Sequence, residues 1–223
     1  MHKFFKKVLS FFVEMEEYST TSELNGDIDV SWIDGRKTLN VGEANYSFGA
    51  LHDVFKEAFQ KIEIHKYNFK NVLILGYAAG SAAVLLRKNN NFQGVIHGVE
   101  LDKDIINIAE EHFPEGIDAA NEIFIEDAFL YVQKCTQQYD LIIVDLYLDV
   151  NIPEHFEKEV FIKNVKSICS SSGMVIFNKI ASTIPQKYQA QRLLSVLQDN
   201  FPEVVSIELT NCPENRMFVV KLQ

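Results

Sequence analysis

Cysteine is scarce in this sequence, and its three positions exclude the common cysteine-based sites. Cys135, Cys169 and Cys212 lie far apart, with no CxxC pair and no metal-ligand spacing among them or relative to the six histidines. We therefore expect free thiols and no bound metal ion. Free thiols are typical of proteins in reducing compartments, so the sequence predicts a cytoplasmic protein.

Basic residues are also few. The chain has 21 Lys and Arg against 31 Asp and Glu, a net charge of −10. A surface with this charge repels polyanions, and the only cluster of basic residues in the sequence is Lys3, Lys6 and Lys7. We expect no nucleic-acid partner.

Long apolar runs are missing as well. No stretch approaches the roughly 20 residues that span a bilayer. The apolar residues 8–13 follow the N-terminal lysines, but Glu14, Glu16 and Glu17 come directly after them, and no small-residue cleavage site is present. We interpret this segment as a short amphipathic helix, and we expect a soluble protein with no membrane partner.

The residues that are present predict a globular chain. An apolar content of 47% over 223 residues is enough for a substantial core, in one large domain with a small appendage. Residues 27–33 and 36–41 have extended patterns around Asp34-Gly35, which predicts a β-hairpin. Apolar residues from Phe48 to Ile62 recur at helical spacing. We expect a strand-and-helix region over residues 1–66.

The remainder, residues 67–223, alternates apolar runs of strand length with helical stretches, which predicts a parallel sheet in an α/β domain. Five strand and helix pairs are expected, with strands at 72–75, 95–99, 123–125, 141–144 and 174–177 and helices at 82–88, 103–112, 129–134, within 153–168 and at 186–200. Strands 204–209 and 217–222 are joined by a loop too short for a crossover helix, so they are antiparallel. The result is a Rossmann-like, mostly parallel seven-stranded sheet with a C-terminal antiparallel hairpin, the topology of AdoMet-dependent methyltransferases.

Ligands of such sheets bind beyond the carboxyl ends of the strands. The first parallel strand runs into residues 76–81, GYAAGS, where small residues allow a ligand to approach the backbone at a helix N-terminus. Glu100 ends the second strand, 24 positions after Gly76. This spacing favours a carboxylate that accepts hydrogen bonds from ribose hydroxyls, although a solvated acid is the alternative.

Two further strand ends carry acids. Asp127 follows the third strand, where it would either accept a proton of an adenine amino group or cap the next helix. Asp145 ends the fourth strand, with Tyr147 and Asp149 just beyond, and it could orient or deprotonate a nucleophile or serve as a cap. Asn178-Lys179 end the fifth strand, where they would either line the same cleft or meet solvent, and we expect solvent.

These segments together resemble the spermidine synthases, the polyamine aminopropyltransferases. The resemblance rests on the loop 76–81, Val99-Glu100-Leu101-Asp102, Glu126-Asp127-Ala128, Tyr139 to Asp145, and Glu43-Ala44-Asn45-Tyr46 upstream. It implies a cleft for S-adenosylmethionine or its decarboxylated form, and a homodimer formed through the N-terminal strands. Glu100 would hold the ribose, Asp127 the adenine amino group, and Asp145 would be the catalytic aspartate, with Tyr147 or Asp149 assisting. The implied cofactor-binding residues are Gly76, Tyr77, Ala78, Ala79, Gly80, Glu100, Leu101, Asp127, Ala128 and Asp145.

The chain also departs from the family pattern. Ala79 stands where the family has the aspartate that meets the aminopropyl amine, and Ser47-Phe48 replace a Gln or His and a Glu. An acid at position 79 would repel the carboxylate of intact AdoMet. Our sequence hypothesis is therefore methyl transfer from AdoMet to a small acceptor. The alternatives are aminopropyl transfer from decarboxylated AdoMet, and a non-catalytic nucleoside-binding or dimerisation module.

Overall fold

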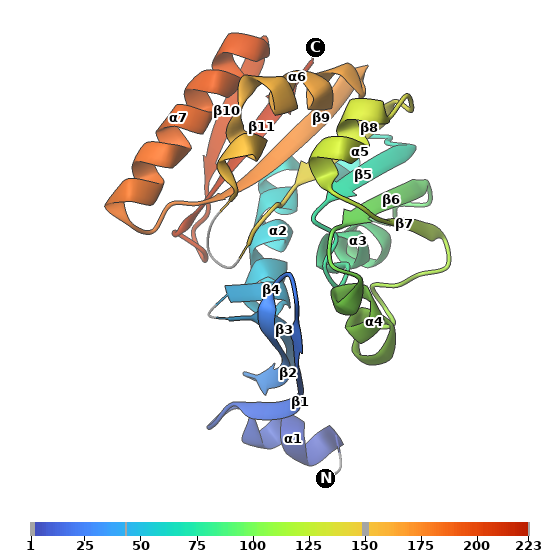
Figure 1. Cartoon of the computed structure of the whole chain (residues 1–223), viewed down its shortest axis with the longest axis vertical. Helices are drawn as coiled ribbons and strands as arrows, with labels where there is room; N and C mark the ends of the chain where they lie inside the picture. The colour runs from blue at the N-terminus through green and yellow to red at the C-terminus, as the bar shows by residue number, and fades with distance from the viewer. Residues whose placement is uncertain (1–2, 43, 149–151, 223) are drawn as a thin grey trace.

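The N-terminal part of the chain is a helix followed by a four-stranded antiparallel sheet. The computed structural model describes residues 3–42, 44–148 and 152–222 (Figure 1). Helix α1 (Lys3–Leu9) precedes strands β1 (Met15–Ser22), β2 (Gly26–Ile33), β3 (Arg36–Val41) and β4 (Ala44–Phe48), which pair in sequence order. The predicted hairpin is β2–β3, and its turn residues Asp34 and Gly35 both have positive φ, as a two-residue type I′ turn requires.

The second sheet has seven strands and confirms the predicted fold. Its strands are β5 (Asn71–Leu75), β6 (Val95–Glu100), β7 (Asn121–Ile125), β8 (Tyr139–Val144), β9 (Cys169–Ile180), β10 (Glu203–Glu208) and β11 (Asn215–Lys221). The order is β10-β11-β9-β8-β5-β6-β7, with β5 to β9 parallel and β11 antiparallel to both its neighbours. The chain runs from β5 to β6 and β7 on one side and then to β8 on the other. This reversal opens a crevice at the carboxyl ends of β5, β6 and β8.

Helices cover both faces of the seven-stranded sheet. They are α2 (Gly49–Ile62), α3 (Ser81–Val84), α4 (Lys103–His112), α5 (Ala128–Lys134), α6 (Glu159–Ser167) and α7 (Ile184–Asn200). Short 3₁₀ turns occur at Ile64–Lys66 and Glu154–Glu157. The helix expected at 82–88 is α-helical only to Val84, and Leu85–Asn89 continues as a π-helical turn. In the described part of the chain, no helix is both long enough and apolar enough to cross a membrane.

The core consists of two apolar clusters on the two faces of the seven-stranded sheet and a third cluster between the N-terminal sheet and α4. Along β5, Leu73 and Leu75 face the cluster with α5, α6 and α7, whereas Val72 and Ile74 face the cluster with α2 and α3. This burial on both faces explains why the parallel strands are continuous apolar runs. The third cluster packs Val30 and other residues of the N-terminal sheet against α4 and Ala79. The N-terminal sheet is thereby fixed beside the crevice.

Candidate functional site

A cavity of about 490 Å³ lies at the carboxyl ends of the parallel strands. The strand ends contribute Gly76, Glu100 and Asp145 to its wall. The N-terminal sheet contributes Asn25 and Tyr46 on one side, and the start of α7 and the β10–β11 loop close the other, with Gln186, Glu214 and Asn215. The volume and concave shape are those of a small-molecule site.

The loop after β5 approaches the backbone after β8 closely. Gly76 has φ +85°, and a Cβ atom at this position would lie 2.0 Å from the carbonyl oxygen of Asp145. Only glycine fits here, because a side chain would push the two strand ends apart. Gly76 and Ala78 line the cavity, but Tyr77, Ala79 and Gly80 do not.

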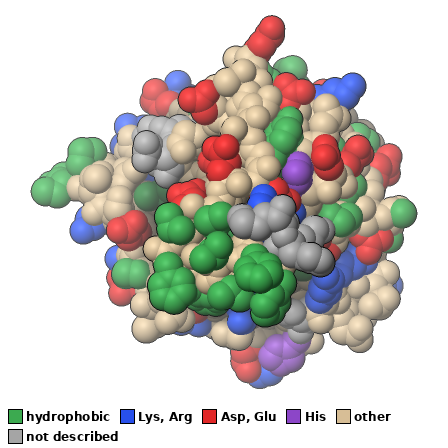
Figure 2. Space-filling view, turned by 90° about the horizontal axis from the view of Figure 1, so that it is seen from below, with side chains coloured by type: hydrophobic (Ala, Val, Ile, Leu, Met, Phe, Trp, Pro, Cys, Tyr) green, Lys and Arg blue, Asp and Glu red, His purple; other side chains and the backbone are tan. Residues whose placement is uncertain are grey.

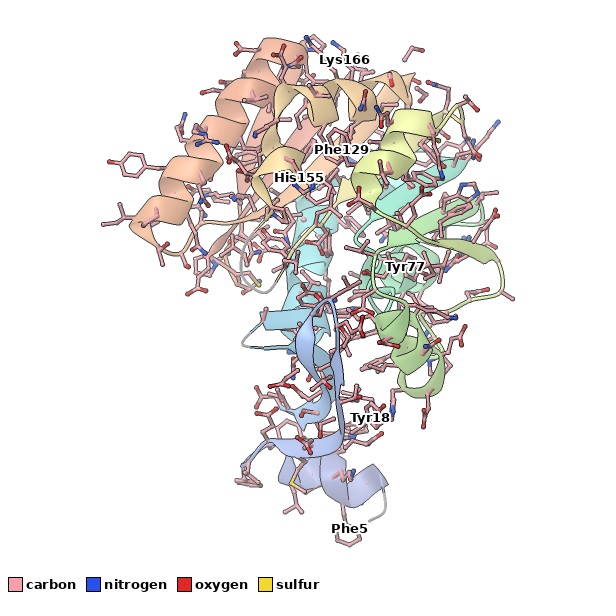
Figure 3. All side chains as sticks on the ribbon, viewed as in Figure 1. Phe5, Tyr18, Tyr77, Phe129, His155 and Lys166 are labelled. Carbon is pink, nitrogen blue, oxygen red and sulfur yellow. The ribbon has the colours of Figure 1, made fainter. Side chains whose placement is uncertain are left out.

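Tyr77 and Ala79 have packing roles instead. The Tyr77 ring is buried beside α3, and its hydroxyl donates to the carbonyl oxygen of Gly116 at 2.5 Å (Figure 3). Ala79 is fully buried in the third apolar cluster. The methyl group of Ala79 therefore packs against the N-terminal sheet and α4 and is not part of the cavity wall.

Glu100 is a buried carboxylate held by backbone donors. Its Oε2 accepts from the amide of Ala78 at 2.9 Å, and its Oε1 accepts from Leu101 and Asp102 at 2.8 and 3.1 Å. Burial raises the pKa of Glu100, and these three N–H donors oppose the rise. Since a carboxylate has about four acceptor positions, one remains on Oε2 for a ligand hydroxyl.

Asp127 is the N-cap of α5. Its Oδ1 accepts from the amides of Phe129 and Leu130 at 2.8 and 3.1 Å. The residue also lines the cavity, as do Leu101 and Ala128 beside it. The structure therefore shows the capping role, and one carboxylate oxygen, Oδ2, is not used for it.

Asp145 lines the cavity, and its carboxyl group is buried. Burial raises the pKa of Asp145 to about 7, the negative charge of Glu100 adds to the rise, and a hydrogen bond from Asn178 opposes it. The amide Nδ2 of Asn178 donates to Asp145 Oδ1 at 2.9 Å, and Nδ2 of Asn215 donates to Asn178 Oδ1 at the same distance. A side chain with a pKa near neutrality can exchange a proton under physiological conditions.

The hydroxyl of Tyr147 forms hydrogen bonds with the backbone of β9. It accepts from the amide of Ile180 at 2.7 Å and donates to the carbonyl oxygen of Asn178 at 3.2 Å. Burial raises the pKa of Tyr147 far above its usual value, so the phenol stays protonated. These contacts favour a structural role over the assisting role expected from the sequence. Asp149, the other expected assistant, lies outside the described residues.

Asn178 lines the cavity, so the sequence-based preference for exposure to solvent over a place in the cleft is wrong. Asn178 and Lys179 are 1% and 3% exposed, because β9 continues to Ile180 and both of its faces are covered. Lys179 points away from the cavity and pairs with the buried Glu157 at 2.6 Å. The signal that could have found Asn178 is its position directly after the apolar run 174–177, with Ile180-Ala181 following Lys179.

Tyr46, part of the upstream segment of the resemblance, reaches the cavity from the N-terminal sheet. Its hydroxyl lies 2.7 Å from the carbonyl oxygen of Tyr147 and 3.2 Å from Oδ1 of Asn25. Asn25 in turn donates to Asp102 at 2.7 Å. These contacts link the N-terminal sheet to the segment after β8 and complete the cavity wall.

The charged side chains of the described cavity wall are all acidic. The described lining residues include five acids and no Lys, Arg or His; the acids are Glu100, Glu126, Asp127, Asp145 and Glu214. His52 and His155 lie outside the wall, in contact with Ser81 and with Phe156 respectively. Such a cavity fits a ligand with hydroxyl groups and positive charge, and both features belong to an adenosyl sulfonium compound.

Comparisons with known proteins identify the family of the chain. The family model of the spermine/spermidine synthase domain matches residues 54–221. The polyamine aminopropyltransferase of Alkaliphilus metalliredigens is 28% identical over 156 residues, which cover 66% of this chain and 54% of the relative. That of Vibrio vulnificus is 25% identical over 156 residues, covering 69% and 50%. The chain thus spans about half the length of these curated relatives.

Solved structures share the fold. The crystal structure of spermidine synthase from Thermotoga maritima has a TM-score of 0.68 at 18% identity, covering 94% of this chain and 73% of that one. Human methyltransferase-like protein 13 in complex with SAH has a TM-score of 0.60 at 19% identity, covering 78% and 80%. The family model covers well over half of the chain, and we conclude that the protein belongs to the spermine/spermidine synthase domain family.

Proposed function

We propose that this protein is an aminopropyltransferase that moves an aminopropyl group from decarboxylated AdoMet to an amine. The relatives named polyamine aminopropyltransferases support this function over the methyl transfer that the sequence hypothesis favoured. The observation that carries the proposal is the charge of the cavity, whose described wall has five acids and no basic side chain.

This charge distinguishes the two donors. Decarboxylated AdoMet has a sulfonium and an ammonium group, both positive, whereas intact AdoMet also has a carboxylate. In a wall without a described basic side chain, that carboxylate would face acids of its own sign. Ala79 does not change this argument, because it is buried away from the cavity. Discrimination would thus come from the acids at the strand ends.

Each strand-end acid has a role in this proposal. Glu100 would accept a hydrogen bond from a ribose hydroxyl at the free position on Oε2, and Asp127 would meet the adenine amino group through Oδ2. Asp145 would accept a proton from the acceptor amine. The amine nitrogen then forms a bond to the aminopropyl carbon attached to sulfur, as the bond between that carbon and sulfur breaks. Methylthioadenosine leaves as a neutral thioether. The protein aligns the two reactants and removes the proton.

Calorimetric titration with the two donors tests the proposal. We expect decarboxylated AdoMet to bind about tenfold or more tightly than AdoMet, a difference of about 1.4 kcal/mol. Glu100→Gln should weaken the binding of decarboxylated AdoMet, whereas Glu203→Gln, an exposed acid at the start of β10, should not change it. Release of methylthioadenosine in the presence of putrescine would then identify the transfer.

The other outcomes select the alternatives. Tighter binding of intact AdoMet, lost in Glu100→Gln, would favour methyl transfer. Binding of neither compound would favour a non-catalytic module and contradict the proposal.

A further inference from the structure

The N-terminal helix presents its apolar side chains to solvent. Phe4 is 70% exposed and Phe12 is 87% exposed. The other exposed apolar side chains of this segment are Phe5, Val8, Leu9, Phe11 and Val13. Seen from below, the molecule has apolar side chains gathered on one face (Figure 2), and Phe5 points away from the protein at this end (Figure 3). We call these seven residues the α1 apolar face. Contiguous exposed apolar surface of this kind marks an interaction site.

The α1 apolar face is held in this orientation by the protein. Ser10 is buried, and its Oγ donates to the carbonyl oxygen of Lys7 at 2.8 Å and accepts from the amide of Gly35 at 2.9 Å. The carbonyl oxygen of Ser10 accepts from the amide of Asp34 at 3.0 Å. These bonds attach the end of α1 to the β2–β3 turn. The segment is therefore anchored by its polar serine. The Phe11 ring also lies against Gly35, and the other apolar side chains are exposed.

The charge of the same segment differs from that of the rest of the chain. Residues 1–13 include Lys3, Lys6 and Lys7 and no acid, in a protein with a net charge of −10. Phenylalanines beside lysines on a short helix are typical of helices that lie in a lipid interface. In such helices the apolar residues enter the boundary of the acyl chains and the basic residues attract anionic headgroups. Here Lys7 is exposed, whereas Lys6 lies against Glu17.

We propose that the α1 apolar face binds the surface of an anionic lipid bilayer. Figure 1 places α1 at the end of the N-terminal sheet farthest from the seven-stranded sheet, so the cavity stays accessible when α1 is bound. Repulsion from the other acids of the protein is screened beyond about 8 Å at physiological salt. The proposal replaces the sequence-based expectation of no membrane partner, and it does not depend on the proposed transferase activity.

A second copy of the chain fits the face less well. A two-fold interface would bring this patch against itself and place the lysines of both copies side by side. Glu17, which lies 3.8 Å from Lys6, is already engaged by Lys37 at 2.5 Å and by the indole of Trp32 at 2.6 Å. It is not available to neutralise a partner's lysines. Anionic headgroups supply counter-charge for the exposed Lys7.

Vesicle sedimentation of the full chain tests the proposal. We expect the protein to sediment with vesicles of phosphatidylglycerol and phosphatidylcholine, less at high salt, and weakly with phosphatidylcholine alone. The double substitution Phe4→Ser/Phe12→Ser should lower the partition coefficient by about tenfold or more. Ile184→Ser on α7 is the matched control, because Ile184 is as exposed as Phe4, and it should sediment like the wild type. Lys7→Glu should reduce the preference for anionic vesicles.

Two results would overturn the proposal. One is the absence of sedimentation with anionic vesicles, or sedimentation that the double substitution leaves unchanged. The other is a light-scattering mass of two chains that falls to one in Phe4→Ser/Phe12→Ser without vesicle binding, which would show that a second copy covers the α1 apolar face. Circular dichroism of each variant confirms that its fold is retained.

Discussion

Asp145 is the acid of the cavity wall whose pKa is raised to about 7. If it accepts the proton of the acceptor amine, Asp145→Asn should lower kcat by about 10²- to 10⁴-fold, because the amide cannot act as a base. The affinity for the donor should fall much less than kcat, since the side chain keeps its shape and only one of the five wall acids loses its charge. Methylthioadenosine release measures kcat, and titration measures affinity. Asp199→Asn, a change of an exposed acid on α7, should leave both unchanged, and equal activity of the two variants would remove Asp145 from the mechanism.

The pH dependence follows from the raised pKa of Asp145. Only the ionised carboxylate accepts a proton, so kcat/KM should rise with pH through about 7, the value that burial and Glu100 impose on the free protein. A bound sulfonium favours the ionised form, so the corresponding rise in kcat should lie at lower pH. Rates measured across this pH range at low and at saturating donor concentrations give kcat/KM and kcat respectively. A flat kcat/KM across this range would contradict the assignment.

Sequence reasoning located residues at strand ends but not the direction of their side chains. Glu100 and Asp145 could be predicted, because the carboxyl end of a parallel strand fixes where the next residue lies. Tyr147 follows by two positions, and only the path of the chain after β8 shows that its hydroxyl is engaged by the backbone of Asn178 and Ile180. Ala79 shows the same limit, since its burial depends on the N-terminal sheet.

The β10–β11 hairpin is the element that connects the sheet edge to the cavity. Its Asn215 donates to Asn178 Oδ1, which orients the Asn178 amide so that Nδ2 faces Asp145. The hydrogen bond from Asn178 lowers the pKa of Asp145, so its weakening must raise that pKa. Asn215 is therefore a positioning residue that acts through Asn178.

Removing the hydrogen bond from Asn215 to Asn178 should change the pH profile of kcat/KM. In Asn215→Ala, the rise of kcat/KM should move to higher pH by up to about one unit, the equivalent of one hydrogen bond to a charged group. Asn68→Ala, an exposed asparagine outside the cavity wall, is the control and should leave the profile in place. A loss of activity at all pH values without a shift would indicate a structural role only.

Helices and strands with a strong hydrophobic pattern could be predicted from the sequence. Strands that are identified by their pairing with another strand could not. Strand β1 is mainly polar and partly exposed, so only its pairing with β2 identifies it. Strand β9 was expected over 174–177 but extends over 12 residues, because β11 pairs with it as far as Ile180 and Tyr139 of β8 pairs with Cys169 at its start. The π-helical turn after α3 has no signal in single-sequence propensities.

At the scale of the whole molecule, Asp102 joins the N-terminal sheet to the Rossmann-like part. Its Oδ1 caps α4 by accepting from the amide of Asp104 at 2.9 Å. Its Oδ2 accepts from Ser22 Oγ at 2.5 Å and from Asn25 Nδ2 at 2.7 Å. The carboxylate is 3% exposed, so these bonds replace water. The boundary expected at residue 66 remains a prediction, and this contact crosses it.

Asp102→Ala should therefore have two effects. The free energy of unfolding should fall by about 2–4 kcal/mol, from the lost cap and the lost hydrogen bonds to a buried charge. The KM for the amine should also rise, because Asn25 bonds to Tyr46 and both line the cavity. Urea denaturation measures the first effect and initial rates the second. Asp104→Ala removes an exposed acid of the same helix turn and should cost less than about 1 kcal/mol with an unchanged KM. Equal effects of the two substitutions would mean that the N-terminal sheet completes the cavity without being held by Asp102.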